Sequence, residues 1–155
     1  MRLVSIDIVI VNFRSATDTQ QALTRLAPWT HGTVWLVDNS AHEPGLTSDS
    51  IALREAVAGM PWARLLCPGD NIGFGRACNL AFSESTAEFF LLLNPDACIA
   101  VKDVLLLAST LADQPRLGAV SPKIYWNAQR SSKSWGKRHP VAAGPQVCWP
   151  ATAHL

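Results

Sequence analysis

Apolar runs alternate along the chain with stretches in which hydrophobic residues recur every three or four positions, the spacing of amphipathic helices. The apolar runs have the length and the flanking turn residues of strands. The predicted strands are Leu3–Asn12, Thr33–Asp38, Ala63–Cys67, Glu88–Leu93 and Leu117–Tyr125. The predicted helices are Ser15–Ala27, Asp49–Ala58, Gly75–Ser83 and Val101–Ala112. This alternation predicts an α/β fold, a Rossmann-like and mainly parallel sheet with helices on both faces.

The most informative strand is the apolar run Phe89–Leu93, which stops at Asn94-Pro95-Asp96. An unbroken apolar run predicts a strand buried on both faces. Proline has no N–H and disfavours helix in the residue before it, so the strand must end here, with Asp96 at its tip. Burying an unpaired carboxylate costs several kcal/mol. We therefore expect Asp96 to meet a metal ion or another ligand.

Polar residues follow several of the predicted strands. In open parallel sheets, ligands bind beyond the carboxyl ends of the strands, where these residues would converge. For Asp38 alone, a role in a turn or a helix cap is an equal alternative, because aspartate favours turns generally. The residues that follow the strands are Asn12, Asp38 with Asn39, Asp70 with Asn71, and Asn94 with Asp96.

A glycine-containing loop, Asn71–Gly75, precedes a predicted helix. Glycines permit close backbone approach and a helix N-terminus favours anions, so the loop suits a phosphate-bearing ligand. The alternative is that the loop is an ordinary turn before a helix. For Arg76, binding of a phosphate and a role as a solvated cation are equal alternatives. A dehydrogenase-like dinucleotide site is disfavoured, because its glycine fingerprint belongs after the first strand and Cys78 occupies the third glycine position.

Composition narrows the classes of protein to which the chain can belong. With 155 residues, 48% of them hydrophobic and 16% charged, the chain predicts a folded globular protein, and a net charge of +1 argues against nucleic acid as a partner. The four cysteines form no CxxC pair, so we expect reduced thiols, a cytoplasmic location and no zinc site. No apolar run reaches the roughly 18 residues of a membrane span. Residues 126–155 have no clear periodicity and predict an irregular tail.

Four motifs together resemble the family 2 glycosyltransferases of the GT-A fold, especially their rhamnosyltransferase-like members. Their order and spacing match over roughly residues 4–124, and they are more specific together than singly. The chain departs from the commoner pattern at Arg14, where asparagine is usual. The motifs are Ile8–Phe13, Val37–Ser40, Asn71–Gly75 with Asn79, and Leu91–Asp96.

The resemblance implies a site for a nucleotide-diphosphate sugar. In such enzymes the acid at the Asp38 position contacts the base or ribose. Asp96 corresponds to the last acid of the family's DXD metal site, which fits Mg²⁺ or Mn²⁺ bound through one or two carboxylates plus phosphate oxygens. The remaining cofactor-binding residues that we expect around the donor are Asn12, Asn39, Asn71, Gly73, Gly75, Arg76, Asn79 and Asn94.

The family normally continues into an acceptor-binding half, whose carboxylate acts as the general base in inverting transfer. This chain has no Asp or Glu after Asp113, and His139 or His154 would be improvised substitutes. The catalytic residues are therefore unassigned. We expect a truncated or split enzyme of polysaccharide biosynthesis, with a nucleotide-sugar-binding domain over residues 1–125. Its acceptor would be a glycan or a lipid-linked molecule. The chain would be cytoplasmic, with peripheral association at the inner face of the membrane. The alternative is a non-catalytic nucleotide-sugar-binding remnant.

Overall fold

The computed structural model describes residues 4–45, 47–125 and 146–148. The chain forms two compact units, Met1–Pro95 and Asp96–Leu155. The division falls inside the Asn-Pro-Asp sequence. The first unit is thus shorter than the nucleotide-sugar-binding domain expected over residues 1–125, whose extent stays a prediction.

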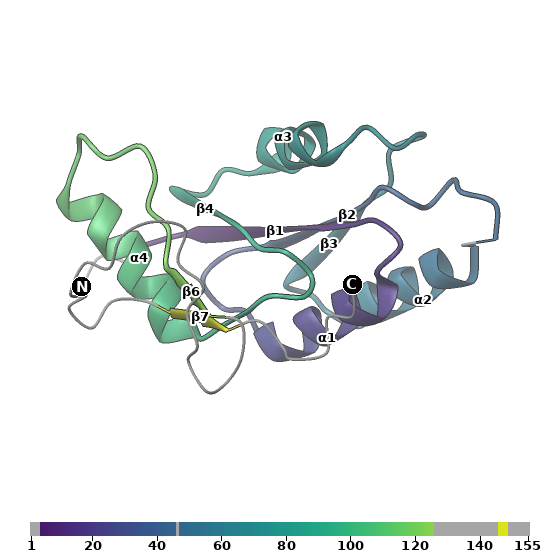
Figure 1. Ribbon diagram of the computed structural model, residues 1–155, viewed down its shortest axis with the longest axis horizontal. Helices are drawn as coiled ribbons and strands as arrows, with labels where there is room; N and C mark the ends of the chain where they lie inside the picture. Colours follow the sequence, from purple (N-terminus) through teal and green to yellow (C-terminus); the bar gives the residue numbers. More distant parts are fainter. Residues whose placement is uncertain (1–3, 46, 126–145, 149–155) are drawn as a thin grey trace. The chain divides into compact units, whose positions relative to one another are not determined.

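The first unit contains a four-stranded parallel sheet with the strand order β3-β2-β1-β4. In Figure 1, helix α3 lies on one face of this sheet, and helices α1 and α2 lie on the other. The predicted alternation of strands and helices is therefore confirmed. The strands are β1 (Ile6–Asn12), β2 (Val34–Asp38), β3 (Ala63–Leu66) and β4 (Phe89–Leu92), and the helices are α1 (Ala16–Leu26), α2 (Thr47–Ala58) and α3 (Phe74–Glu84).

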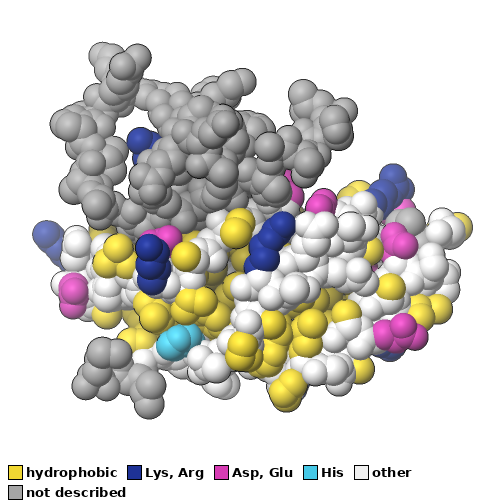
Figure 2. All heavy atoms as spheres, turned by 90° about the horizontal axis from the view of Figure 1, so that it is seen from below, with side chains coloured by type: hydrophobic (Ala, Val, Ile, Leu, Met, Phe, Trp, Pro, Cys, Tyr) yellow, Lys and Arg dark blue, Asp and Glu magenta, His cyan; other side chains and the backbone are white. Residues whose placement is uncertain are grey.

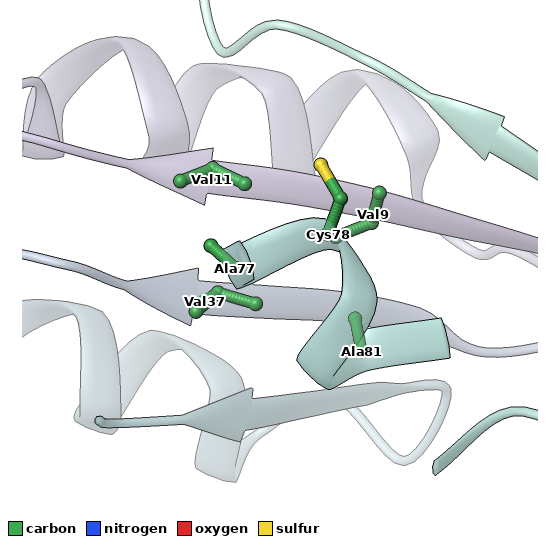
Figure 3. Close-up of a cluster of buried hydrophobic side chains, with 6 residues drawn as sticks. All are labelled: Val9, Val11, Val37, Ala77, Cys78 and Ala81. Carbon is green, nitrogen blue, oxygen red and sulfur yellow. The ribbon is translucent and has the colours of Figure 1, made fainter. Parts of the chain in front are cut away.

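Strand β1 lies at the centre of the core, since all seven of its residues are buried. Its alternate side chains face the two helical layers, as the two-residue period of a strand requires. Small residues on α3 allow the helix to pack closely on the sheet. Figure 3 shows this packing, formed by Val9, Val11 and Val37 from the strands and Ala77, Cys78 and Ala81 from the helix.

The other end of β1 carries a buried carboxylate. Asp7 accepts hydrogen bonds from the backbone N–H of Thr33 and from the indole Nε1–H of Trp35, each at 2.7 Å. It also accepts a hydrogen bond from the Ser85 hydroxyl, again at 2.7 Å. Asp7 therefore links the start of β2 to the end of α3. It does so at the amino ends of the strands, opposite to the carboxyl ends that carry the candidate site.

Strand β4 is not the buried strand that its apolar sequence predicts. It is the last strand in the described sheet and pairs only with β1 there. Phe89, Phe90 and Leu91 are half-buried, and Leu92 is 54% exposed. An apolar run reports only that its side chains can be buried, and strand order decides whether both faces and both edges are covered.

The second unit contains a helix and a small sheet with the order β5-β7-β6. The predicted strand Leu117–Tyr125 is correct only over its last three residues, and these pair with β7 rather than with the large sheet. Pro122 has no N–H for a ladder, which is consistent with the late start. Strand β7 lies in the stretch expected to be irregular. The elements are β5 (Cys98–Ile99), α4 (Val101–Asp113), β6 (Lys123–Tyr125) and β7 (Gln146–Cys148).

Candidate functional site

The carboxyl ends of β1 and β2 meet at one edge of the sheet. The two strands are parallel, and their last pair in register is Asn12 with Asp38. The backbone continues this pairing, since the N–H of Asn39 donates to the carbonyl of Asn12 at 2.9 Å. Two of the predicted site residues are thus neighbours for a simple geometrical reason.

The Asp38 carboxylate is fully buried and held by hydrogen bonds. Its Oδ1 accepts from Asn12 Nδ2 at 2.8 Å, and from the hydroxyl and backbone N–H of Ser40 at 2.9 and 3.1 Å. Its Oδ2 accepts from the hydroxyl of Ser50 at 2.7 Å. Burial alone would raise the pKa of Asp38, but the hydrogen bonds from Ser50, Asn12 and Ser40 outweigh it and hold the pKa below its ordinary value.

Asn12 connects this carboxylate to helix α1. Its side-chain oxygen accepts from the Ser15 hydroxyl at 3.2 Å and from the Thr19 hydroxyl at 3.1 Å, while its Nδ2 donates to Asp38 and to Ser40. Both polar atoms of the buried Asn12 amide therefore have hydrogen-bond partners, as is usual for buried polar groups. We call the set Asn12, Thr19, Asp38, Ser40 and Ser50 the edge network.

The edge network shows what the Asp38 carboxylate does in this structure: it orders the loop after β2 and ties that loop to α1 and α2. The expected contact of Asp38 with a base or ribose stays a prediction. Asn39, beside it, is also buried, and its side-chain Oδ1 is a buried oxygen without a hydrogen-bond partner in the described part of the chain. A buried acceptor of this kind is matched by a donor from water or from a ligand.

A second loop borders the same edge of the sheet. Gly73 has φ +77°, which favours glycine, and its N–H donates to the side-chain oxygen of Asn71 at 3.0 Å before α3 begins. The N–H of Asn71 donates to Nε2 of His42 at 3.2 Å, which joins this loop to the loop after β2. The predicted loop is therefore an ordered turn that starts a helix. Gly75 lies in the first turn of that helix.

Three predicted site residues are exposed and stand apart from the edge network. Arg76 and Asn79 lie on α3, and Asn94 follows β4. Among the described residues, none of these side chains has a recorded hydrogen bond or ion pair. Their roles in binding a donor remain predictions.

Asp96, the expected metal ligand, is the first residue of the second unit and is half-buried. The described residues include no group of three or more His, Cys, Asp or Glu side chains that could hold a metal ion. One carboxylate does not form a closed protein site. It does fit Mg²⁺ or Mn²⁺, which keep several water ligands and take substrate phosphate oxygens.

Two residues of the edge network, Thr19 and Ser50, escaped the sequence analysis. Each is a polar residue on the buried stripe of its helix. Thr19 shares that stripe with Ala22, Leu23 and Leu26, and Ser50 precedes the buried Leu53 by three positions. A hydroxyl at a core-facing helical position needs a partner, so this pattern was a usable signal.

None of the described helices combines the length and apolar character needed to cross a bilayer. On the face drawn in Figure 2, cationic and anionic side chains of the described residues are mixed and scattered among neutral ones. Cys67, Cys78 and Cys98 are free thiols.

The arrangement of strands and helices defines the class of fold: the chain has the Rossmann-like GT-A fold of glycosyltransferases. It is similar to the mannosyltransferase PcManGT from Pyrobaculum calidifontis, solved with GDP-Man and Mn²⁺, at 21% identity and a TM-score of 0.59 over 76% of this chain and 34% of that chain. It is also similar to S. aureus TarS 1–349, at 16% identity and a TM-score of 0.53 over 80% of this chain and 35% of that chain.

The chain therefore spans about a third of the length of these solved structures. Its sequence matches no protein-family model and no curated protein. The predicted GT-A architecture is confirmed by the structural likeness, which concerns the fold.

Proposed function

We propose that this chain is the donor-binding part of a family 2 glycosyltransferase, which binds a nucleotide-diphosphate sugar at the carboxyl edge of its parallel sheet. The observation that carries the proposal is the edge network, which orders the loop after β2 at the position where such sheets bind ligands. PcManGT, which has the same fold, was solved with a nucleotide sugar and Mn²⁺.

In this proposal, Asp96 binds a divalent cation, Mg²⁺ or Mn²⁺. When bound, the cation would neutralise charge on the departing diphosphate. The loops at Asn39 and at Asn71–Gly73 would surround the nucleotide. The exposed residues Arg76, Asn79 and Asn94 would contact the donor from the surface of the site. Asn12 and Asp38 would position the loop at Asn39, which His42 joins to the loop at Asn71–Gly73.

The acceptor would be a glycan or a lipid-linked molecule, and the transfer would be inverting. A general base with a free lone pair must then deprotonate the acceptor hydroxyl. In this proposal the base belongs to the acceptor-binding part of such an enzyme, since no carboxylate of this chain is assigned to that role. A cytoplasmic location, with peripheral contact at the inner face of the membrane, belongs to the same proposal.

A binding experiment tests the proposal. Calorimetry with GDP and with UDP, each with and without Mn²⁺, is expected to show binding by the full chain that EDTA weakens about tenfold or more. D96A should lose the Mn²⁺-dependent part of the affinity, whereas D113A, a change of an exposed acid on α4, should not. Equal affinity with and without the cation would refute the metal-dependent site. Tight binding of NAD instead would point to the dinucleotide class.

The second candidate is a non-catalytic nucleotide-sugar-binding module. It is favoured by the edge network, because Asp38 is buried and both of its oxygens are used by hydrogen bonds within the chain. A turnover assay of the chain alone separates the two candidates. Release of nucleoside diphosphate from a nucleotide sugar supports the enzyme, and binding without release supports the module.

A further inference from the structure

Among the residues that follow the strands at this end of the sheet, Arg14 is the one that a purely structural role explains least. It is the sole non-glycine residue with a positive φ, +54°, among the described residues. The left-handed region disfavours a long side chain, and asparagine or glycine would adopt it more readily. The backbone therefore does not explain an arginine at this position, so its guanidinium is the part to consider.

The guanidinium is held at one side and open to water elsewhere. Its Nε and Nη2 both approach the same oxygen, Oε2 of Glu43, at 2.8 and 2.7 Å. Its central carbon lies 5.1 Å from the centre of the Phe13 ring. The Arg14 side chain nevertheless remains 62% exposed. A guanidinium has five N–H donors, so most of them are left for another acceptor.

The position of Arg14 connects it to the candidate site. It follows β1 two residues after Asn12, and its backbone N–H donates to the hydroxyl of Ser40 at 3.4 Å. Ser40 in turn donates to Asp38. The edge network thus fixes the backbone of Arg14, while Glu43 orients its side chain.

Glu43 competes for this cation through a single oxygen. The pair is only partly exposed, since the side chain of Glu43 is 17% exposed and that of Arg14 is 62% exposed, so water screens it mainly from the arginine side. A phosphate group offers several charged oxygens that match the planar guanidinium, and its charge is larger than that of a carboxylate. A diphosphate arriving at the strand edge can therefore replace Glu43 as the partner of Arg14.

We propose that Arg14 is a phosphate-binding residue of the donor site, held ready by Glu43 and transferred to the diphosphate when the nucleotide binds. This inference rests on the proposed function, since it assigns a further residue to the same ligand. It predicts opposite effects for the two partners of one ion pair. Losing Arg14 weakens diphosphate binding, and neutralising Glu43 strengthens it.

The experiment compares R14N, R14K, E43Q and the control R25Q in the full chain with Mn²⁺. Arg25 is an exposed arginine in the last turn of α1, so R25Q removes a cation outside the edge network. Calorimetry would use GDP and UDP, with guanosine and uridine as probes that lack phosphate. We expect R14N to weaken diphosphate binding about tenfold, the value of one charge-assisted hydrogen bond. R14K should lie between R14N and the wild-type chain.

R14N relieves the left-handed backbone but removes the cation beside the partly buried Glu43, so these two effects oppose each other and the variant should stay folded at the temperature of the binding assay, which its melting curve checks. Nucleoside binding should be unchanged in every variant. If R14N and E43Q both weaken binding, or if R14N matches the wild-type chain, Arg14 is a structural link and the inference is wrong while the proposed function stands. If the wild-type chain binds neither diphosphate, both are wrong.

Discussion

The Ser50 hydroxyl provides the sharpest test of the edge network. Ser50 is buried on α2 and donates at 2.7 Å to Oδ2 of Asp38, which has no other recorded partner in the described chain. S50A removes this donor and leaves a buried carboxylate oxygen unpaired. A hydrogen bond to a charged group is worth about 1.5–3 kcal/mol. Alanine recovers about 0.5 kcal/mol through its helix propensity, so we expect a net loss of about 2 kcal/mol.

The loss should depend on pH in a defined direction. Because the folded pKa of Asp38 lies below its ordinary value, its contribution is fully present above that value and is lost as the pH falls through the folded pKa. S50A removes the leading hydrogen bond that lowers this pKa. The folded pKa therefore rises in the variant, and the difference in stability from the wild-type chain should shrink in acid.

Urea unfolding followed by circular dichroism at about pH 7 and about pH 3 measures both effects. At neutral pH, the melting temperature should also fall by about 4–8 °C. S83A is the matched control. It removes an exposed helical serine hydroxyl that donates to a backbone carbonyl on α3, and should change stability by less than about 0.5 kcal/mol. A loss of the same size at both pH values, or none at neutral pH, would refute the role of Asp38 as a charged centre.

Three further substitutions test other parts of the first unit by the same unfolding measurement. T19V keeps the shape but removes the 3.1 Å hydrogen bond to Asn12, and should cost about 1 kcal/mol. G32A places a Cβ 2.5 Å from Oδ1 of Asp7 and against the backbone of β1, and should cost about 3 kcal/mol, unlike the neutral G69A, whose Cβ meets nothing. L92K changes a side chain that is 54% exposed, so a cost above about 0.5 kcal/mol would contradict the exposure of that side chain.

Local sequence patterns were sufficient for the elements of the first unit. The strand Leu3–Asn12 was predicted to end at Asn12, and β1 ends there. The helix predicted over Ser15–Ala27 is observed over Ala16–Leu26. These predictions succeed because the hydrophobic period and the turn residues act within a few positions along the chain. The meeting of Asn12 with Asp38 was likewise predictable, since parallel strands have their carboxyl ends at one edge.

Predictions that depended on distant partners were less successful. The apolar sequence of β4 indicated a buried strand, but the described sheet ends with it. The sequence Leu117–Tyr125 was expected to extend the large sheet, but only its last three residues form a strand, and they pair with β7. Strand order and pairing depend on contacts far apart in the sequence, and propensity carries little information about them.

The sequence by itself determined the class of fold, the order of its elements and the polar residues that follow each strand, because period and turn chemistry are local properties. Only the tertiary structure decided that Asp38 is a buried, fully hydrogen-bonded carboxylate, since its partners come from β1, from the loop after β2 and from α2. It also decided that Arg14 lies against Glu43, 29 positions away. Hydrogen bonds of this kind form only when the packed core has set the backbone positions, so no local pattern encodes them.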